Sequence, residues 1–290
     1  MTAMLIAANL AAVAALLAPM IAGADPAAAS GAAHATDAPI LLALSVPVLL
    51  AVAVGETSGR RLDAKGVALL GVLCGLNAVL RVPGAIGGAS MIFALPIVCG
   101  AVFGPAFGFL LGALSFAASG LITAGIGPWL PFQMFAAGWI GAGAGLLRPF
   151  AERVRPAAAV AMLCAYGYAA GFFFGVVTDL WFWPYLAAGD ASVGWRTGMG
   201  AAEAAGAFRR FYMLTSFAWD AGRAIGNVVL IGVLGVPALR LLRRWRDRMW
   251  VAPASADSGE YVVVRREVVC RPAGVRVDDD PVGADQERAG

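Results

Sequence analysis

A stripe of polar and charged residues interrupts an apolar stretch toward the end of the chain. Tyr212, Ser216, Asp220, Arg223 and Asn227 are separated by four, four, three and four residues, so a helix places them on one face. A carboxylate and a guanidinium in such a stripe can neutralise each other, transfer a proton or bind a polar ligand. Because a charged group inside a membrane is costly, the stripe is predicted to face protein or a pocket.

Further polar and aromatic residues stand at the ends of other apolar stretches: Asn77 and Arg81, Trp129 and Gln133, and Asp179, Trp181 and Trp183. A few fixed polar groups within aromatic walls are the usual form of a small-molecule site. We predict that these residues bind a substrate in one outward-facing pocket, together with Tyr212, Ser216, Asp220 and Arg223. Two simpler roles stay open. Tryptophans also anchor membrane proteins at the interface, and amide side chains also bond across helices.

The elements that position these residues are predicted to be membrane-spanning helices. Of the 290 residues, 60% are hydrophobic and 13% are charged, and the mean hydropathy is +0.79, whereas a soluble domain carries about 25% charge. A spanning helix needs about 20 residues. The sequence therefore predicts an all-α integral membrane protein with about eight transmembrane helices, over 3–22, 39–55, 65–82, 91–103, 106–123, 129–147, 157–179 and 212–239.

Basic residues in the connections predict the orientation. With the N-terminus inside, eleven Lys and Arg residues lie on the cytoplasmic side, and four lie outside: Arg81, Arg196, Arg209 and Arg210. Because basic residues concentrate in cytoplasmic loops, both termini are expected in the cytoplasm. The last span then begins outside near residue 211, which puts Asp220 about 13 Å and Arg223 about 17 Å along it.

Several chemistries lack the residues they need. The four cysteines form no Cys-x-x-Cys pair and His34 is the only histidine, so neither a metal site nor a cofactor is predicted. No phosphate-binding loop is present, so ATP hydrolysis would need another subunit. We expect no nucleic-acid binding and no enzymatic activity. The alternative is a proton-coupled carrier or an intramembrane enzyme that uses Asp220 with Arg223.

Small residues line one face of two predicted helices. Ala64, Ala68, Gly71 and Gly75 form a smooth stripe over which another helix can approach closely. The glycines within 129–147 form a similar stripe, for which we expect packing inside the bundle.

Five segments match a known pattern as a set: residues 77–81, 84–90, 103–105, 107–112 and, most distinctive, Gly-Pro-Trp-Leu-Pro-Phe-Gln-Met at 127–134. They resemble the substrate-binding S components of energy-coupling-factor (ECF) transporters, and the similarity spans about residues 64–240. The resemblance implies a six-helix S-component core at 61–248. Two additional N-terminal transmembrane helices at 1–60 and a polar, largely disordered cytoplasmic tail at 249–290 depart from the family's usual plan. The first of these helices would be lost if Ala22 to Ala24 were a signal cleavage site, but no basic leader precedes it.

The resemblance also implies a function. S components bind a vitamin on the external side of the bacterial plasma membrane, and a transmembrane coupling protein with two cytoplasmic ATPases drives uptake. In that family an Ala-x-x-x-Ala pattern faces the coupling protein; it corresponds to Ala64 and Ala68, and Gly71 and Gly75 continue the stripe. The following segment closes over the ligand in the family, which would make Gly84, Gly87, Gly88 and Ser90 part of a lid. The S components most similar to this chain are those assigned to cobalamin or a related corrinoid.

Overall fold

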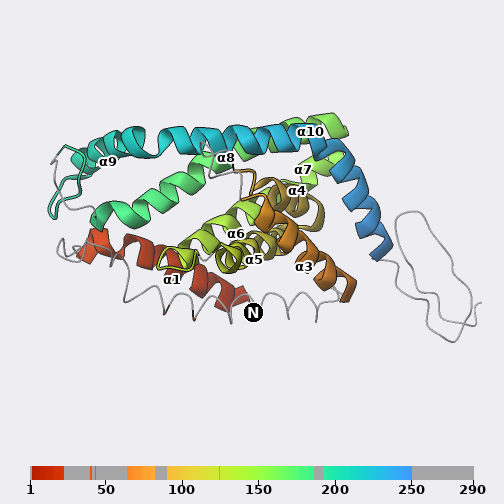
Figure 1. Ribbon diagram of the computed structural model, residues 1–290, viewed down its shortest axis with the longest axis horizontal. Helices are drawn as coiled ribbons and strands as arrows, with labels where there is room; N and C mark the ends of the chain where they lie inside the picture. The colour runs from red at the N-terminus through yellow and green to blue at the C-terminus, as the bar shows by residue number, and fades with distance from the viewer. Residues whose placement is uncertain are drawn as a thin grey trace, which may run out of the picture.

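The computed structural model describes residues 2–22, 40, 43, 64–81, 90–123, 125–185 and 192–249. Within them the elements are α1 (Thr2–Ala22), α3 (Ala64–Val79), α4 (Ala94–Phe103), α5 (Pro105–Ile122), α6 (Leu130–Leu146), α7 (Arg148–Arg153), α8 (Pro156–Phe182), the short 3-10 helix η3 (Trp183–Tyr185), α9 (Ala201–Thr215) and α10 (Phe217–Met249). Most of the long helices run along the long axis of the molecule (Figure 1). The described residues contain no strand, which confirms the all-α fold class.

Four helices are long and apolar enough to cross a membrane: Pro105–Ile122, Leu130–Arg153, Pro156–Tyr185 and Phe217–Asp247. They overlap four of the predicted spans, closely for the first three and in part for the last. Shorter apolar helices occupy the places of three others, at Asn9–Ile21, Ala64–Val79 and Ala94–Phe103. The predicted span at 39–55 lies outside the described residues, apart from 40 and 43. The described part of the chain is therefore helical, with four helices that could span a membrane by their length and composition.

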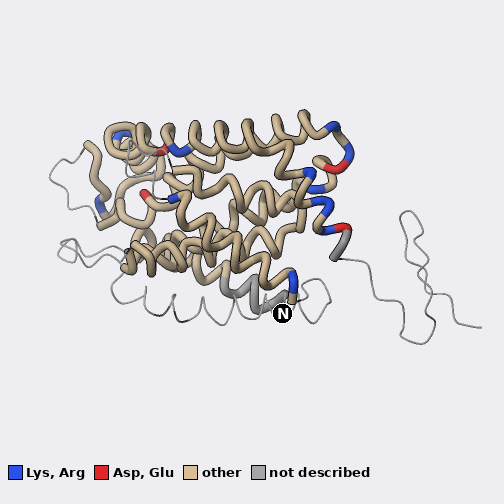
Figure 2. Tube along the Cα trace, turned by 45° about the vertical axis from the view of Figure 1, so that its right-hand side comes forward, with Lys and Arg blue, Asp and Glu red and all other residues tan. Residues whose placement is uncertain are grey.

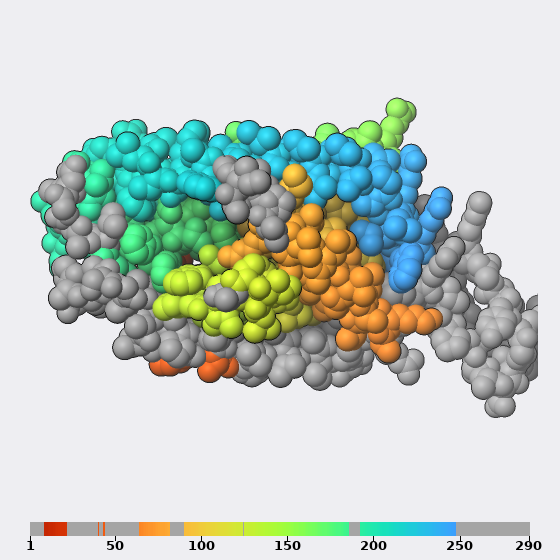
Figure 3. Space-filling model, viewed as in Figure 1, coloured from red at the N-terminus to blue at the C-terminus, as the bar shows by residue number. Residues whose placement is uncertain are grey.

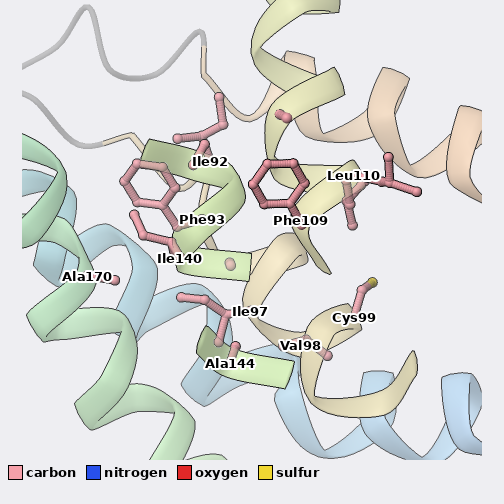
Figure 4. Close-up of a cluster of buried hydrophobic side chains, with 14 of the residues drawn as sticks. Ile92, Phe93, Ile97, Val98, Cys99, Phe109, Leu110, Ile140, Ala144 and Ala170 are labelled. Atoms are coloured by element: carbon pink, nitrogen blue, oxygen red, sulfur yellow. The ribbon is translucent and has the colours of Figure 1, made fainter. Parts of the chain in front are cut away.

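Glycines allow α5 and α6 to pack at close backbone distance. A methyl group added to Gly108 would overlap the backbone of Gly141, and one added to Gly141 would overlap Gly108. Gly100 of α4 meets the same backbone, which brings three helices together around one point. The expectation that the glycines of 129–147 pack inside the bundle is thus confirmed. Large side chains fill the space beside this contact, and Figure 4 shows Phe93, Ile97 and Ile140 gathered there.

Helix α10 packs along α8 through small residues of α8. Gly171 faces the backbone of Ala224, and Gly175 faces the carboxylate of Asp220. A side chain at either glycine would separate the two helices. This contact fixes where the charged part of α10 lies in the bundle.

The final predicted span differs from the structure at both ends. The sequence predicts one helix over 212–239, whereas α9 ends at Thr215 and α10 runs from Phe217 to Met249. The break is at Ser216, although its amide still donates to the Tyr212 carbonyl at 3.0 Å. Asp220 therefore lies in the first turn of α10, about 5 Å from the start of that helix rather than about 13 Å along it.

Charged side chains gather toward the two ends of the bundle and leave an uncharged length between them (Figure 2). At the end formed by α7 and the C-terminal half of α10, Arg246 donates to Glu152 at 2.6 Å and to the Val102 carbonyl at 3.1 Å, and Arg243 donates to the Ala151 carbonyl at 2.9 Å. At the opposite end, Ala207 and Phe211 of α9 are buried against Trp183. The charge distribution is the one expected of a bundle that crosses a membrane.

Candidate ligand-binding site

Arg81 connects three helices at the end of α3. Its guanidinium donates to Ser119 Oγ of α5 at 3.2 Å and to Gln133 Oε1 of α6 at 3.3 Å. Both acceptors are neutral, so these bonds orient the guanidinium without cancelling its charge. Two of the predicted site residues, Arg81 and Gln133, are therefore in direct contact.

Two arginines lie over a layer of phenylalanine rings. The Arg81 guanidinium is 5.0 Å from the centre of the Phe116 ring, and the Arg223 guanidinium is 5.0 Å from the centre of the Phe174 ring. The two ring centres are 5.2 Å apart, and Phe93 packs against both. Cations bind favourably over aromatic faces, so the rings hold Arg81 and Arg223, from α3 and α10, in one neighbourhood.

Asp220 is saturated by protein partners. Its side chain accepts a hydrogen bond from Tyr212 Oη at 2.8 Å and forms an ion pair with Arg223. Asp220 is 2% exposed. Its carboxylate occupies the space that a side chain at Gly175 would fill. Of the roles that the sequence leaves open for Asp220 and Arg223, the structure shows mutual neutralisation in a buried contact between α10, α9 and α8; their role in substrate binding stays a prediction.

Asp179 lies beside this network, at the end of α8. Its Oδ1 accepts a hydrogen bond from Ser216 Oγ at 2.8 Å, whereas its Oδ2 is buried without a hydrogen-bond partner. Ser216 therefore contributes to the cluster from the break between α9 and α10, one turn before Asp220, whose amide donates to the Ser216 carbonyl at 3.0 Å. The five-residue stripe is correct as a cluster but wrong as a single helix.

Buried polar groups without partners lie next to Arg81. Asn77 is fully buried one turn before Arg81, and neither its Nδ2 nor its Oδ1 has a hydrogen-bond partner. Ser90 is also buried with an unpartnered hydroxyl, and the Met91 amide beside it donates to the Leu80 carbonyl at 3.3 Å. An unsatisfied buried polar group costs about 1–3 kcal/mol, and such groups in a native protein call for a water or a ligand.

Aromatic side chains form a patch around the start of α6 and the end of α8. The rings of Trp129 and Trp181 meet edge to face at 6.4 Å, and Phe132 lies 6.3 Å from Trp181. Trp129 is 40% exposed and stands one turn before Gln133. The predicted neighbours Trp129, Trp181 and Gln133 are thus brought to the same region.

Trp183 belongs to a different cluster. Its indole donates to the Val193 carbonyl at 2.8 Å, and its ring packs against Trp195 and Phe208. It is 2% exposed, so it fastens residues 192–195 and α9 to the end of α8. Its contacts separate it from the other predicted site residues.

Asn227 is a buried amide whose hydrogen bonds are satisfied within the bundle. It is fully buried, accepts a hydrogen bond from the Phe93 amide at 3.1 Å and donates to the Arg223 carbonyl at 2.9 Å. These bonds give Asn227 a packing role between α10 and the residue before α4.

The stripe on α3 points away from the described core. Ala64, Ala68, Gly71 and Gly75 are exposed, and a side-chain carbon at Gly71 or Gly75 would meet nothing within 4 Å. α3 forms part of the surface in Figure 3, where it is drawn in orange. Of the predicted lid residues, Gly84, Gly87 and Gly88 lie outside the described residues, and Ser90 is buried beside Met91.

Sequence reasoning missed the residues that support the site: Phe93, Phe116, Ser119 and Phe174. Ser119 carries a usable signal, because a hydroxyl inside a spanning segment needs a partner. The phenylalanines carry none, since apolar residues fill every helix of the bundle. No group of His, Cys, Asp and Glu with metal-binding geometry occurs in the part of the chain that the structure describes.

Comparisons with family models, curated proteins and solved structures found no match for this chain.

Proposed function

We propose that this protein is the membrane-embedded S component of an ECF-type importer in the bacterial plasma membrane, with both termini in the cytoplasm. It binds a vitamin from the external side, and a transmembrane coupling protein with two ATPases drives uptake. The observation that carries the proposal is the buried Asn77 amide, unsatisfied at both atoms and one turn from Arg81. A buried polar group that has no partner within the bundle supports a role in binding a ligand.

Two groups of residues around Arg81 and Gln133 support binding of a small molecule. Arg81, Gln133 and Ser119 fix polar groups on one side, and Trp129 and Trp181 provide an aromatic patch next to Gln133. Few oriented polar groups beside aromatic walls suit an organic ligand. The aromatic surface suits a large, partly flat molecule, and the family resemblance favours cobalamin or a related corrinoid.

The exposed face of α3 supports a partner helix. Ala64, Ala68, Gly71 and Gly75 leave it smooth, and Val72 beside them is 70% exposed. Helices in membranes associate through small residues that allow close approach. We assign this face to the coupling protein.

Co-purification and binding test the proposal together. The protein is expressed with the coupling protein and ATPases of an ECF system, and complex formation is measured by size-exclusion chromatography in detergent. The purified chain is then heated with each vitamin of a panel, since a ligand that binds the folded state raises the midpoint. We expect a stable complex and one stabilising vitamin. Failure to associate together with no stabilising vitamin would refute the proposal.

The competing function, a proton-coupled carrier or intramembrane enzyme, places Asp220 at the centre of the chemistry. Its carboxylate is occupied by Tyr212 and Arg223, which favours a structural role. Transport by the chain alone in proteoliposomes, abolished by Asp220→Asn, would instead support the carrier.

A further inference from the structure

Arg81 carries a charge that no residue described by the structure neutralises. Among the described residues it forms no ion pair, and the charged group that acts on it is Arg223, another cation. The eight residues that follow it, 82–89, contain no Asp or Glu. A half-buried guanidinium beside a second positive charge is unfavourable unless an anion joins them.

Arg223 differs from Arg81 in having a carboxylate of its own. One of its terminal nitrogens, Nη1, faces both Asp220 and the Gly171 carbonyl. Asp220 is therefore committed to Arg223 and Tyr212, and no described contact joins it to Arg81. The cluster around the phenylalanine layer has a local excess of positive charge on the Arg81 side.

Hydrogen-bond donors are also left over at this point. A guanidinium has five N–H donors, of which Ser119 and Gln133 accept one each. The Asn77 amide, in the last turn of α3 and four residues before Arg81, has no hydrogen-bond partner at its nitrogen or at its oxygen. Arg81 and Asn77 together match a planar oxyanion, which takes several N–H donors at once.

We propose that the ligand of this site carries an anionic group, a carboxylate or a phosphate, that binds to Arg81 within the field of Arg223, with Asn77 as a further hydrogen-bond partner. This inference rests on the proposed function and narrows its substrate class. It excludes vitamins that are neutral or cationic throughout. Phe116 and Phe174 then lie beneath the anion-binding arginines and orient them.

Matched probes test the proposal without any mutation. Biotin is compared with biotin amide, and pantothenate with pantothenol; cyanocobalamin is also compared with cobinamide, which lacks the phosphodiester together with the attached nucleoside. Affinities for the purified chain are measured by isothermal titration calorimetry. One acidic member is expected to bind at least about tenfold more tightly than its neutral counterpart, the size of one charge-assisted hydrogen bond.

Arg81→Gln identifies the residue responsible, and Arg209→Gln is the matched control because Arg209 is exposed on α9. Arg81→Gln should weaken the acidic probe at least about tenfold and reduce the preference over the neutral probe, whereas Arg209→Gln should change neither. Equal binding of both members of the pair overturns the proposal, as does unchanged affinity in Arg81→Gln. If Arg81→Gln does not fold, the affinities of the wild-type chain for the acidic and neutral probes still test the proposal.

The outcomes separate this inference from the proposed function. If a neutral vitamin binds as tightly as any acidic one and the chain still assembles with the coupling protein, the anionic ligand is refuted and the importer function is retained. If the chain neither binds a vitamin nor assembles with the coupling protein, both the anionic ligand and the importer function are refuted.

Discussion

Replacing Asn77 by Leu is expected to stabilise the unliganded protein and to weaken ligand binding. Asn77 is fully buried with two unpartnered polar atoms, so the fold bears their desolvation cost without compensation. Leu has the same branched skeleton and no polar atom. The substitution therefore removes the desolvation cost of the amide from the folded state. It also removes a hydrogen-bond partner of the proposed ligand.

The magnitude follows from the free energy of an unmade hydrogen bond. Each unsatisfied buried group costs about 1–3 kcal/mol. The methyl groups of Leu are bulkier than the amide, and the resulting overpacking offsets part of the stabilisation. We expect a net stabilisation of about 1–3 kcal/mol. In a domain of this size, 1 kcal/mol moves the midpoint of thermal unfolding by about 2–4 °C, so the midpoint should rise by about 5 °C.

Asn227 provides a matched control inside the same bundle. It is also fully buried, but its amide bonds to the Phe93 amide and to the Arg223 carbonyl. Asn227→Leu leaves the Phe93 amide without its acceptor, and it should lower the midpoint by about as much as Asn77→Leu raises it. The two variants make the same chemical change with opposite expected signs.

Thiol labelling reports both midpoints. Cys74 and Cys99 are buried, so a fluorogenic maleimide reacts with them as the bundle unfolds in detergent. The stabilising vitamin is then added, and Asn77→Leu should show a smaller ligand-induced increase than the wild type. A midpoint that falls in Asn77→Leu as it does in Asn227→Leu would refute the reasoning, because Asn77 would then be bonded within the protein.

Two further predictions concern the packing of α8 and the outer face of α3. Gly175→Ala should destabilise the protein by about 1–3 kcal/mol in the same thermal assay, because the added methyl group overlaps the Asp220 carboxylate; Gly71→Ala, with open space around it, should change the midpoint little, and equal effects would contradict the assigned contact. Ala68→Trp should abolish vitamin uptake by the complex in proteoliposomes while leaving vitamin binding to the isolated chain intact; parallel loss of uptake and binding would show that the α3 face is not the partner surface.

The sequence predicts the helices well where one signal dominates. The spans corresponding to α5, α6 and α8 appear within a few residues of their expected bounds, because long apolar runs bounded by Gly and Pro leave few alternatives. α9 was missed because Glu203, Arg209 and Arg210 are mixed with its apolar residues, so no long apolar run marks it. The break at Ser216 was missed because hydrogen bonds of helical type continue across it, and the polar stripe keeps its period.

The candidate site was predicted in its residue types but not in its contacts. Arg81 and Gln133 stand 52 positions apart, and no local pattern reveals that they touch. The same holds for Arg81 and Phe116, whose contact depends on how closely α3 approaches α5. Spacing identifies residues on one helix face, whereas partners on other helices follow from packing that a single sequence does not encode locally.

The distribution of partners decides which charged residue serves the fold and which is available to a ligand. Asp220 and Arg223 are the most conspicuous charges in the sequence, because they stand three positions apart in an apolar stretch. Each satisfies the other, and Tyr212 and Gly175 complete the fit, so a ligand would have to break a formed ion pair to reach Asp220. Arg81 has only neutral partners and a like-charged neighbour, and a ligand anion would improve its environment at no such cost. We therefore propose that a ligand gains the most binding free energy at Arg81 and Asn77, and that the buried ion pair fixes the position of Arg223 near Arg81.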